Sequence, residues 1–410
     1  MGMVVHWQEL PEVGRVQGQG HMSSTDPNAI SSPAVRVPRR YFWLKRIAGG
    51  YVLFLAGVAL LSYVASHLAQ SRLDGEIQKI RARGEPVLIE DFVEPAIPDE
   101  ENAAFYLKRA AKAFEKMSNE QVDDFNNLPT KLPWSPADAA LMEKLTARYA
   151  HALPDVRAAR GKTGVNWGMQ LKSPAITVLL PWLTPQRTLS QYLRAAALHA
   201  HQQGDDAAAV ELLRDQLMIG RTVDRSPFLI SHLVALSNSS QAATAALAIA
   251  PDLRVEHPDT PAPAGTKPAS RQQVRALLDE LSDEQSARAA VMRAMWGERL
   301  FQLDSALCIA NGRLDFNFNE PSGPDQPQGS SSTTRQLTIR FVRPLALAEA
   351  RNTLDWSSQA AEAFAQDSLS AASAQIPAIK PRLSSPLMSM LLPALNAAAT
   401  GLPSYFCHPR

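Results

Sequence analysis

The chain has 410 residues, of which 45% are hydrophobic and 20% are charged. This composition supports one large core or two ordinary ones and excludes a wholly disordered protein. Because 41 basic residues nearly balance 40 acidic ones, the chain as a whole has no positive field that would attract nucleic acid, which we exclude as a partner. The two cysteines, Cys308 and Cys407, are too few for a zinc site; they either form one disulfide or remain free thiols.

The first 40 residues are rich in Gly, Pro and Ser and show no sustained periodicity, which predicts that residues 1–46 are a disordered tail. Met22 is an alternative start that would shorten this tail. An N-terminal peptide of the native protein that begins before Met22 would exclude the later start.

An apolar run follows at Ile47–Ala69, with 23 residues and no Asp, Glu, Lys or Arg among them. A helix of this length spans the roughly 30 Å hydrocarbon core of a bilayer. A buried core helix would show a polar face, and a cleaved signal peptide has a shorter apolar region nearer the N-terminus. The run therefore predicts an uncleaved transmembrane helix over residues 47–69, with the lipid bilayer as its partner.

The residues beside this run indicate its orientation. Those expected at the membrane surface are Arg39, Arg40, Trp43, Lys45 and Arg46. Basic residues favour the cytoplasmic side of a span and aromatic rings favour the headgroup layer. Arg72, Lys79, Arg81 and Arg83 follow the run, so the difference in basic residues is small. We expect residues 1–46 in the cytoplasm and the main domain on the other side of the membrane.

Helical periodicity dominates residues 70–250. Gln70–Arg83 is expected to continue as a charged helix until Gly84 and Pro86 stop it. Further helix starts are expected at four capping residues, each beside a proline and each followed by apolar residues at three- and four-residue spacing. These are Asp99, Ser135, Thr184 and Ser226.

Residues 187–221 read as two helices joined at Gly204 and Asp205. Alanines allow close helix packing, and glycine permits the left-handed turn that ends a helix. The pattern is that of one tetratricopeptide-type hairpin. No second copy follows at a period of about 34 residues, and solenoids need about three units. The predicted fold is mainly α: one N-terminal transmembrane helix followed by an irregular helical domain, with a solenoid-like arrangement left open.

Two stretches interrupt the helices. Residues 251–270 are a Pro-rich loop, and residues 311–336 mix Pro, Gly, Ser and Thr, which predicts a flexible loop. Between them, residues 271–310 are expected to be helical. A C-terminal helical region is expected within residues 337–410, with a helix that starts at Pro344, although Leu337–Val342 alternates like a strand.

Signatures of catalysis and metal binding are weak. Gly161-Lys162-Thr163 resembles the end of a phosphate-binding loop, but Val156 stands where its first glycine is needed. His199 and His201 point to different sides of a helix, and His232 is expected to be a core histidine. We therefore assign no catalytic, cofactor-binding or metal-binding residue.

Two groups of residues remain as candidates. Glu298, Arg299 and Asp304 lie in a helix otherwise rich in Ala, Met, Leu and Phe, so they form a candidate polar core or pocket in which an ion pair would more often be structural than catalytic. The stretch Trp167–Trp182 either exposes a surface that binds a partner or rests on the bilayer, or packs its aliphatic residues against the next helix. We favour packing for Ile176, Val178, Leu179 and Leu180.

The anchor, the segment Pro95–Tyr106, the Gly204-Asp205 hairpin and the Trp296–Arg299 helix together resemble uncharacterised bacterial single-pass membrane-anchored helical proteins. The resemblance covers most of residues 47–365 and implies a location in the bacterial inner (cytoplasmic) membrane, but no activity. Such chains often continue into a further helix. This one stops after Pro403–Arg410, so the C-terminus is expected to be truncated.

The sequence therefore favours a membrane-anchored extracytoplasmic helical protein that binds or scaffolds other proteins or envelope components, with no cofactor. The alternative is a hydrolase or other enzyme whose site is assembled from dispersed Glu, Asp and His residues.

Overall fold

The computed structural model describes residues 41–257, 259, 262–313 and 333–364, with the side chains of residues 333–341 left out. Residues 1–40 of the predicted tail, including Met22, Arg39 and Arg40, lie outside the described residues, as do most of the predicted loop 311–336, Cys407 and the chain's end. Residues 42–46, which the prediction assigned to the disordered tail, are helical instead, because α1 begins at Phe42. Throughout the described residues the secondary structure is helical, without named strands, which confirms the mainly α class.

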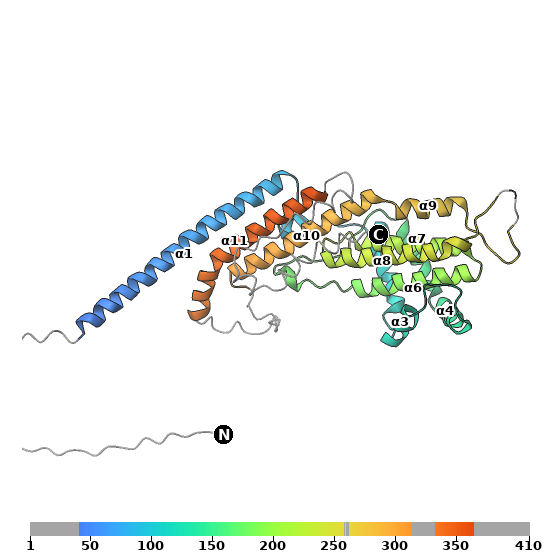
Figure 1. Cartoon of the computed structure of the whole chain (residues 1–410), viewed down its shortest axis with the longest axis horizontal. Helices are drawn as coiled ribbons and strands as arrows, with labels where there is room; N and C mark the ends of the chain where they lie inside the picture. Colours follow the sequence, from blue (N-terminus) through green and yellow to red (C-terminus); the bar gives the residue numbers. More distant parts are fainter. Residues whose placement is uncertain (1–40, 258, 260–261, 314–332, 365–410) are drawn as a thin grey trace, which may run out of the picture. The chain divides into compact units, whose positions relative to one another are not determined.

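The α-helices are α1 (Phe42–Ala82), α2 (Ala103–Ala111), α3 (Asn119–Asn126), α4 (Pro136–Tyr149), α5 (Leu153–Arg160), α6 (Leu183–Gln202), α7 (Asp206–Val223), α8 (Leu229–Ile249), α9 (Arg271–Leu281), α10 (Glu284–Ala310) and α11 (Thr333–Phe364). Short 3₁₀ turns lie at Ile89–Phe92, Asp99–Glu101, Lys112–Phe114, Ala150–Ala152, Ala175–Thr177 and Ala250–Asp252. Figure 1 shows these helices along the chain.

The chain divides into two units, Met1–Gly57 and Val58–Arg410. In the first unit the described residues form the start of α1, where every side chain is exposed. Trp43 and Lys45 lie at this start, and the guanidinium of Arg46 lies 4.5 Å from the centre of the Phe42 ring. The most apolar window of α1 is long enough to cross a membrane, and none of it is buried.

A second helix, α8, is also long and apolar enough to cross a membrane. Its buried face, however, repeats at three- and four-residue spacing through small and polar side chains, among them Ser231, Ala235, Asn238 and Ala242. The exposed side carries Ser237, Ser240 and Thr244. This pattern is that of a helix that packs against neighbours, and α8 contacts α6, α7 and α10.

In the second unit, the end of α1 packs against α10 and α11 (Figure 1). The buried residues of this cluster include Leu73 and Ile77 from α1, Leu303 and Ile309 from α10, and Leu347 from α11. The helix ends at Ala82, and Gly84 adopts a positive φ of 77°, so the predicted stop is confirmed.

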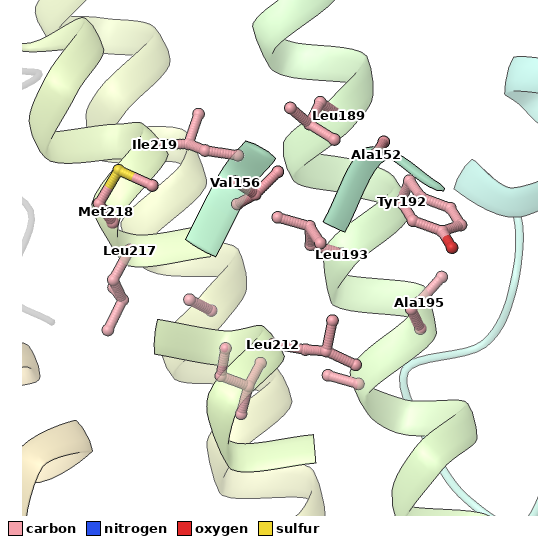
Figure 2. Packing of buried hydrophobic residues seen from close by; sticks show 14 of the residues in the cluster. Ala152, Val156, Leu189, Tyr192, Leu193, Ala195, Leu212, Leu217, Met218 and Ile219 are labelled. Carbon is pink, nitrogen blue, oxygen red and sulfur yellow. The ribbon is translucent and has the colours of Figure 1, made fainter. Parts of the chain in front are cut away.

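The larger core lies among α2 to α9, with α6 and α7 at its centre. Figure 2 shows Val156 of α5 between Leu193 of α6 and Ile219 of α7. All three side chains are fully buried. This packing holds α6 and α7 as a hairpin against α5 on one side and α8 on another.

The turn between α6 and α7 confirms the predicted hairpin. Gly204 has a φ of 83°, and the Asp205 carboxylate caps α7 by accepting a hydrogen bond from the Ala208 N–H at 2.9 Å. The predicted 251–270 loop is irregular where it is described, and it is fastened to this turn. Lys267 forms an ion pair with Asp205 at 2.7 Å, and Arg254 forms one with Asp206 at 2.9 Å.

The strand-like alternation of Leu337–Val342 does not give a strand, because these residues lie inside α11. Pro344 does not start this helix either but lies within it. A proline in a helix interior costs about 3 kcal/mol because it removes a hydrogen bond and crowds the preceding turn. The packing of Ala346, Leu347 and Ala350 against α10 and α1 offsets this cost.

Several helix starts are shifted from their predicted positions. The cap of α2 is Asn102, whose side chain accepts the Ala104 N–H, and Asp99 begins a preceding 3₁₀ turn. The helices expected after Thr184 and Ser226 begin at Leu183 and Leu229. Ser135 caps α4 as predicted. Residues 271–310 form two helices, because Asp283 caps α10 after α9 has ended.

Candidate functional site

The three candidate polar residues of α10 have separate partners. Arg299 is fully buried, and its Nη1 forms an ion pair with Glu85 Oε2 at 2.8 Å. Its Nη2 donates a hydrogen bond to the Pro86 carbonyl oxygen at 2.7 Å. Arg299 therefore fastens the segment that follows α1 to α10, and this role is structural.

Glu298 lies next to Arg299 in the sequence but is held differently. Its Oε1 accepts a hydrogen bond from Gln302 Nε2 at 2.7 Å, one turn along α10. Burial raises the pKa of Glu298, and the hydrogen bond from Gln302 offsets only part of this effect. Such a carboxyl can exchange a proton, but it does not line the pocket described below.

Asp304 has a third role, because it holds a loop. Its Oδ2 accepts a hydrogen bond from the Ala175 N–H at 2.6 Å. Next to this contact, Ser173 Oγ lies 3.1 Å from the buried thiol of Cys308. Both contacts tie the segment between α5 and α6 to α10.

The histidines do not join these residues. His201 Nδ1 contacts the buried Asp206 carboxylate at the start of α7. His232 Nδ1 lies 2.8 Å from Asp224 Oδ1, and His199 stacks on Trp134 with ring centres 6.3 Å apart. Within the described ranges, no three His, Cys, Asp or Glu side chains are placed to hold a metal ion.

A buried carboxylate on α7 stands apart from the residues predicted from the sequence. Asp215 has no exposed side-chain surface, and its Oδ1 lies 3.0 Å from Arg160 Nη1, without the alignment of a hydrogen bond. Burial raises the pKa of Asp215 to about 6, although the charges of Arg160 and Arg157 lower it.

The raised pKa of Asp215 means that its ionisation opposes folding. The protonated carboxyl of Asp215 makes its full contribution to the stability of the folded state at low pH. This contribution is lost as the pH rises through about 6. We expect Asp215→Asn to be more stable than the wild type by about 2 kcal/mol near pH 8, and equally stable near pH 4. Chemical denaturation of the full-length protein at both pH values measures this difference.

Asp124→Asn is the control for Asp215→Asn, because Asp124 is exposed on α3. It should leave the pH dependence unchanged. A less stable Asp215→Asn protein near pH 8 would mean that the arginines stabilise the ionised carboxylate more than burial opposes it.

A pocket lined by both apolar and charged residues lies between α2 and the 164–182 loop, which we define as the residues from Gly164 to Trp182. It has a volume of about 570 Å³. Trp167 and Trp182 are stacked in its wall, with ring centres 5.4 Å apart and planes 9° apart. Leu179 also lines it and is 82% exposed, and Ile176 nearby is 41% exposed. The prediction that these two aliphatic residues pack against the next helix is therefore wrong.

The 164–182 loop is fastened at several points. The Asn102 carboxamide donates to the Asn166 carbonyl oxygen and accepts from the Asn166 N–H, at 2.8 and 2.9 Å. Trp167 Nε1 donates to the Thr222 carbonyl oxygen of α7 at 3.0 Å. Asp304 then holds Ala175. The exposed part of the loop, which includes Leu179, is thus supported by α2, α7 and α10.

Positive charge lines the same pocket. Lys108, Lys112 and Lys172 contribute ammonium groups, against one carboxylate from Glu115. Lys108 Nζ donates to the Trp167 carbonyl oxygen at 2.6 Å. Burial lowers the pKa of Lys108, and the nearby charges of Asp99 and Glu94 oppose this. The pocket therefore combines an apolar wall with cationic groups.

Two buried polar atoms of the lining residues have no hydrogen-bond partner among the residues that the structure describes. They are Trp182 Nε1 and Gln186 Oε1. A buried donor or acceptor without a partner costs about 1 to 3 kcal/mol. Both atoms are buried beneath the surface of the pocket, so this cost is part of the structure of its wall.

The sequence pointed to Trp167–Trp182 as a surface but did not identify the pocket. The lysines of α2 and the indoles of the loop are some 60 residues apart in sequence, and no local pattern links them. No family model, no curated protein and no solved structure matches the chain, so the resemblance to uncharacterised bacterial membrane-anchored proteins stays a prediction.

Proposed function

We propose that this chain is a membrane-anchored protein whose helical domain binds another protein outside the cytoplasm, through the pocket between α2 and the 164–182 loop. The exposed Leu179 beside the stacked Trp167 and Trp182 is the observation that carries the proposal. Large apolar side chains held exposed around a concave surface are typical of interaction sites.

The membrane part of the proposal rests on α1. None of its apolar window is buried, which is costly in water and favourable in lipid. Of the two helices that are long and apolar enough for a span among the described residues, α8 packs against three other helices, so α1 alone crosses the membrane in this proposal. The N-terminus lies in the cytoplasm in this proposal, an orientation that the basic residues before the span support.

Photo-cross-linking in native membranes tests the proposal. We expect a benzoylphenylalanine at position 179 of the full-length protein to capture one recurrent extracytoplasmic protein, identified by mass spectrometry. The same group at Leu278, which is exposed on α9 away from the pocket, is the matched control and should not capture it.

Identical products from positions 179 and 278 would contradict binding at this pocket. Capture of cytoplasmic proteins alone would contradict the proposed orientation.

A further inference from the structure

The pocket between α2 and the 164–182 loop contains groups suited to two different parts of a ligand. Leu179 offers exposed apolar surface beside the largely buried indoles of Trp167 and Trp182, and the lysines offer positive charge, within one open pocket of about 570 Å³. A ligand that uses both must carry a negative group and an apolar group close together.

The lysines differ in how far their charge is already compensated. Lys108 is near Glu94 and Asp99 and donates to Trp167. Lys112 and Lys172 are exposed, and in the part of the chain that the structure describes neither forms an ion pair or a side-chain hydrogen bond. Lys108 and Lys112 are one helical turn apart and so lie on the same side of the chain. The ammonium groups of Lys112 and Lys172 are therefore available to bind an anion.

Building on the proposed function, we infer that the pocket binds the C-terminal residue of the partner protein, and that this residue has a bulky apolar side chain. Its carboxylate lies at Lys112 and Lys172, and its side chain packs against the stacked indoles. A C-terminal residue carries its carboxylate and its side chain on the same Cα, so both fit into one chamber. Capture of a C-terminal carboxylate is an established mode of peptide recognition.

An acidic residue inside a partner's chain would need a second residue to supply the apolar group. The C-terminal residue satisfies both requirements alone.

Peptide binding to the full-length protein in phosphatidylcholine nanodiscs tests this inference. The probes are short fluorescein-labelled glycine–serine peptides that end in phenylalanine with a free carboxylate, in phenylalanine amide, or in alanine with a free carboxylate. Fluorescence anisotropy should show the phenylalanine acid binding at least roughly tenfold more tightly than either of the others.

The variant Lys112→Gln with Lys172→Gln should weaken binding of the phenylalanine acid by roughly tenfold or more, and Lys116→Gln should not. Lys116 is the matched control because it is exposed nearby but does not line the pocket. All three are exposed lysines, so the variants should fold as the wild type does.

Equal binding of the acid and the amide would overturn the inference, as would the absence of binding by every peptide. Equal binding by the wild type and the double lysine variant would also overturn it, because it would show adsorption to lipid. If position 179 still cross-links a partner in any of these cases, the protein-binding function stands and only the C-terminal ligand is wrong.

Discussion

Gly297→Ala is expected to lower the free energy of unfolding by about 3 kcal/mol or more, although it adds a single methyl group. A Cβ at Gly297 would lie 1.5 Å from the carbonyl oxygen of Pro227, in the turn before α8. The backbone fixes the positions of both the added Cβ and the carbonyl oxygen, so rotation of a side chain cannot relieve the contact. The α10 helix would have to move from the start of α8, which would disturb the packing of Val291 and Met295 near Leu229.

Thermal unfolding of the full-length protein in detergent, followed by circular dichroism, measures this effect. We expect a Tm at least about 4 °C lower for Gly297→Ala. The matched control is Gly75→Ala, at a helical position of α1 where an added Cβ has nothing within 4 Å. It should be neutral or stabilising by up to about 1 kcal/mol, because alanine favours helix. A wild-type Tm for Gly297→Ala would show that α10 and Pro227 are not in contact.

Glu85→Ala is expected to cost about 3 to 5 kcal/mol, because it leaves the charge of Arg299 buried with no ion-pair partner. Arg299 has no exposed side-chain surface, so water does not replace the lost carboxylate. The pair itself contributes much less than this, since its attraction is offset by the cost of removing both charges from water. The double variant Glu85→Ala with Arg299→Met should therefore recover much of the lost stability.

A double-mutant cycle from chemical denaturation separates these effects, with Lys79→Ala as the control. Lys79 is exposed and pairs with Glu76, so its loss should cost less than about 1 kcal/mol. If the double variant is as unstable as the sum of the single variants, the two side chains are not coupled.

The pH below which this ion pair stops stabilising the protein follows from the pKa of Glu85. Burial raises that pKa, but hydrogen bonds from Arg83 and Arg299 outweigh burial and leave it below its ordinary value. The stability that the ionised carboxylate contributes is therefore present at neutral pH and is lost only as the pH falls through this lowered pKa.

Local chemistry explains which features the sequence predicts. Ser135 and Asp205 cap helices, and Gly204 takes the left-handed turn, because each depends on hydrogen bonds or sterics within a few residues. The alternation of Leu337–Val342 does not determine its secondary structure, for the opposite reason. Six alternating residues fit either structure, and packing of the rest of α11 against α10 decides between them.

The candidate site shows the same limit. The sequence indicates a candidate polar core on α10, but it does not identify the distant partners of Arg299 and Asp304. Glu85 lies 214 residues before Arg299, and Ala175 lies 129 residues before Asp304. The sequence shows that a buried charge needs a partner, but only the fold identifies that partner. The pocket has no local pattern at all, because α2 and the 164–182 loop form it together.

The side chain of Asn102 caps α2 and at the same time binds both polar backbone groups of Asn166. Fraying of the first turn of α2 therefore also frees the Asn166 end of the 164–182 loop, while Trp167 and Ala175 keep the rest of the loop attached to α7 and α10. A ligand that rests on the loop would in turn stabilise that turn of α2, so the cap of a helix and the binding surface share one amide.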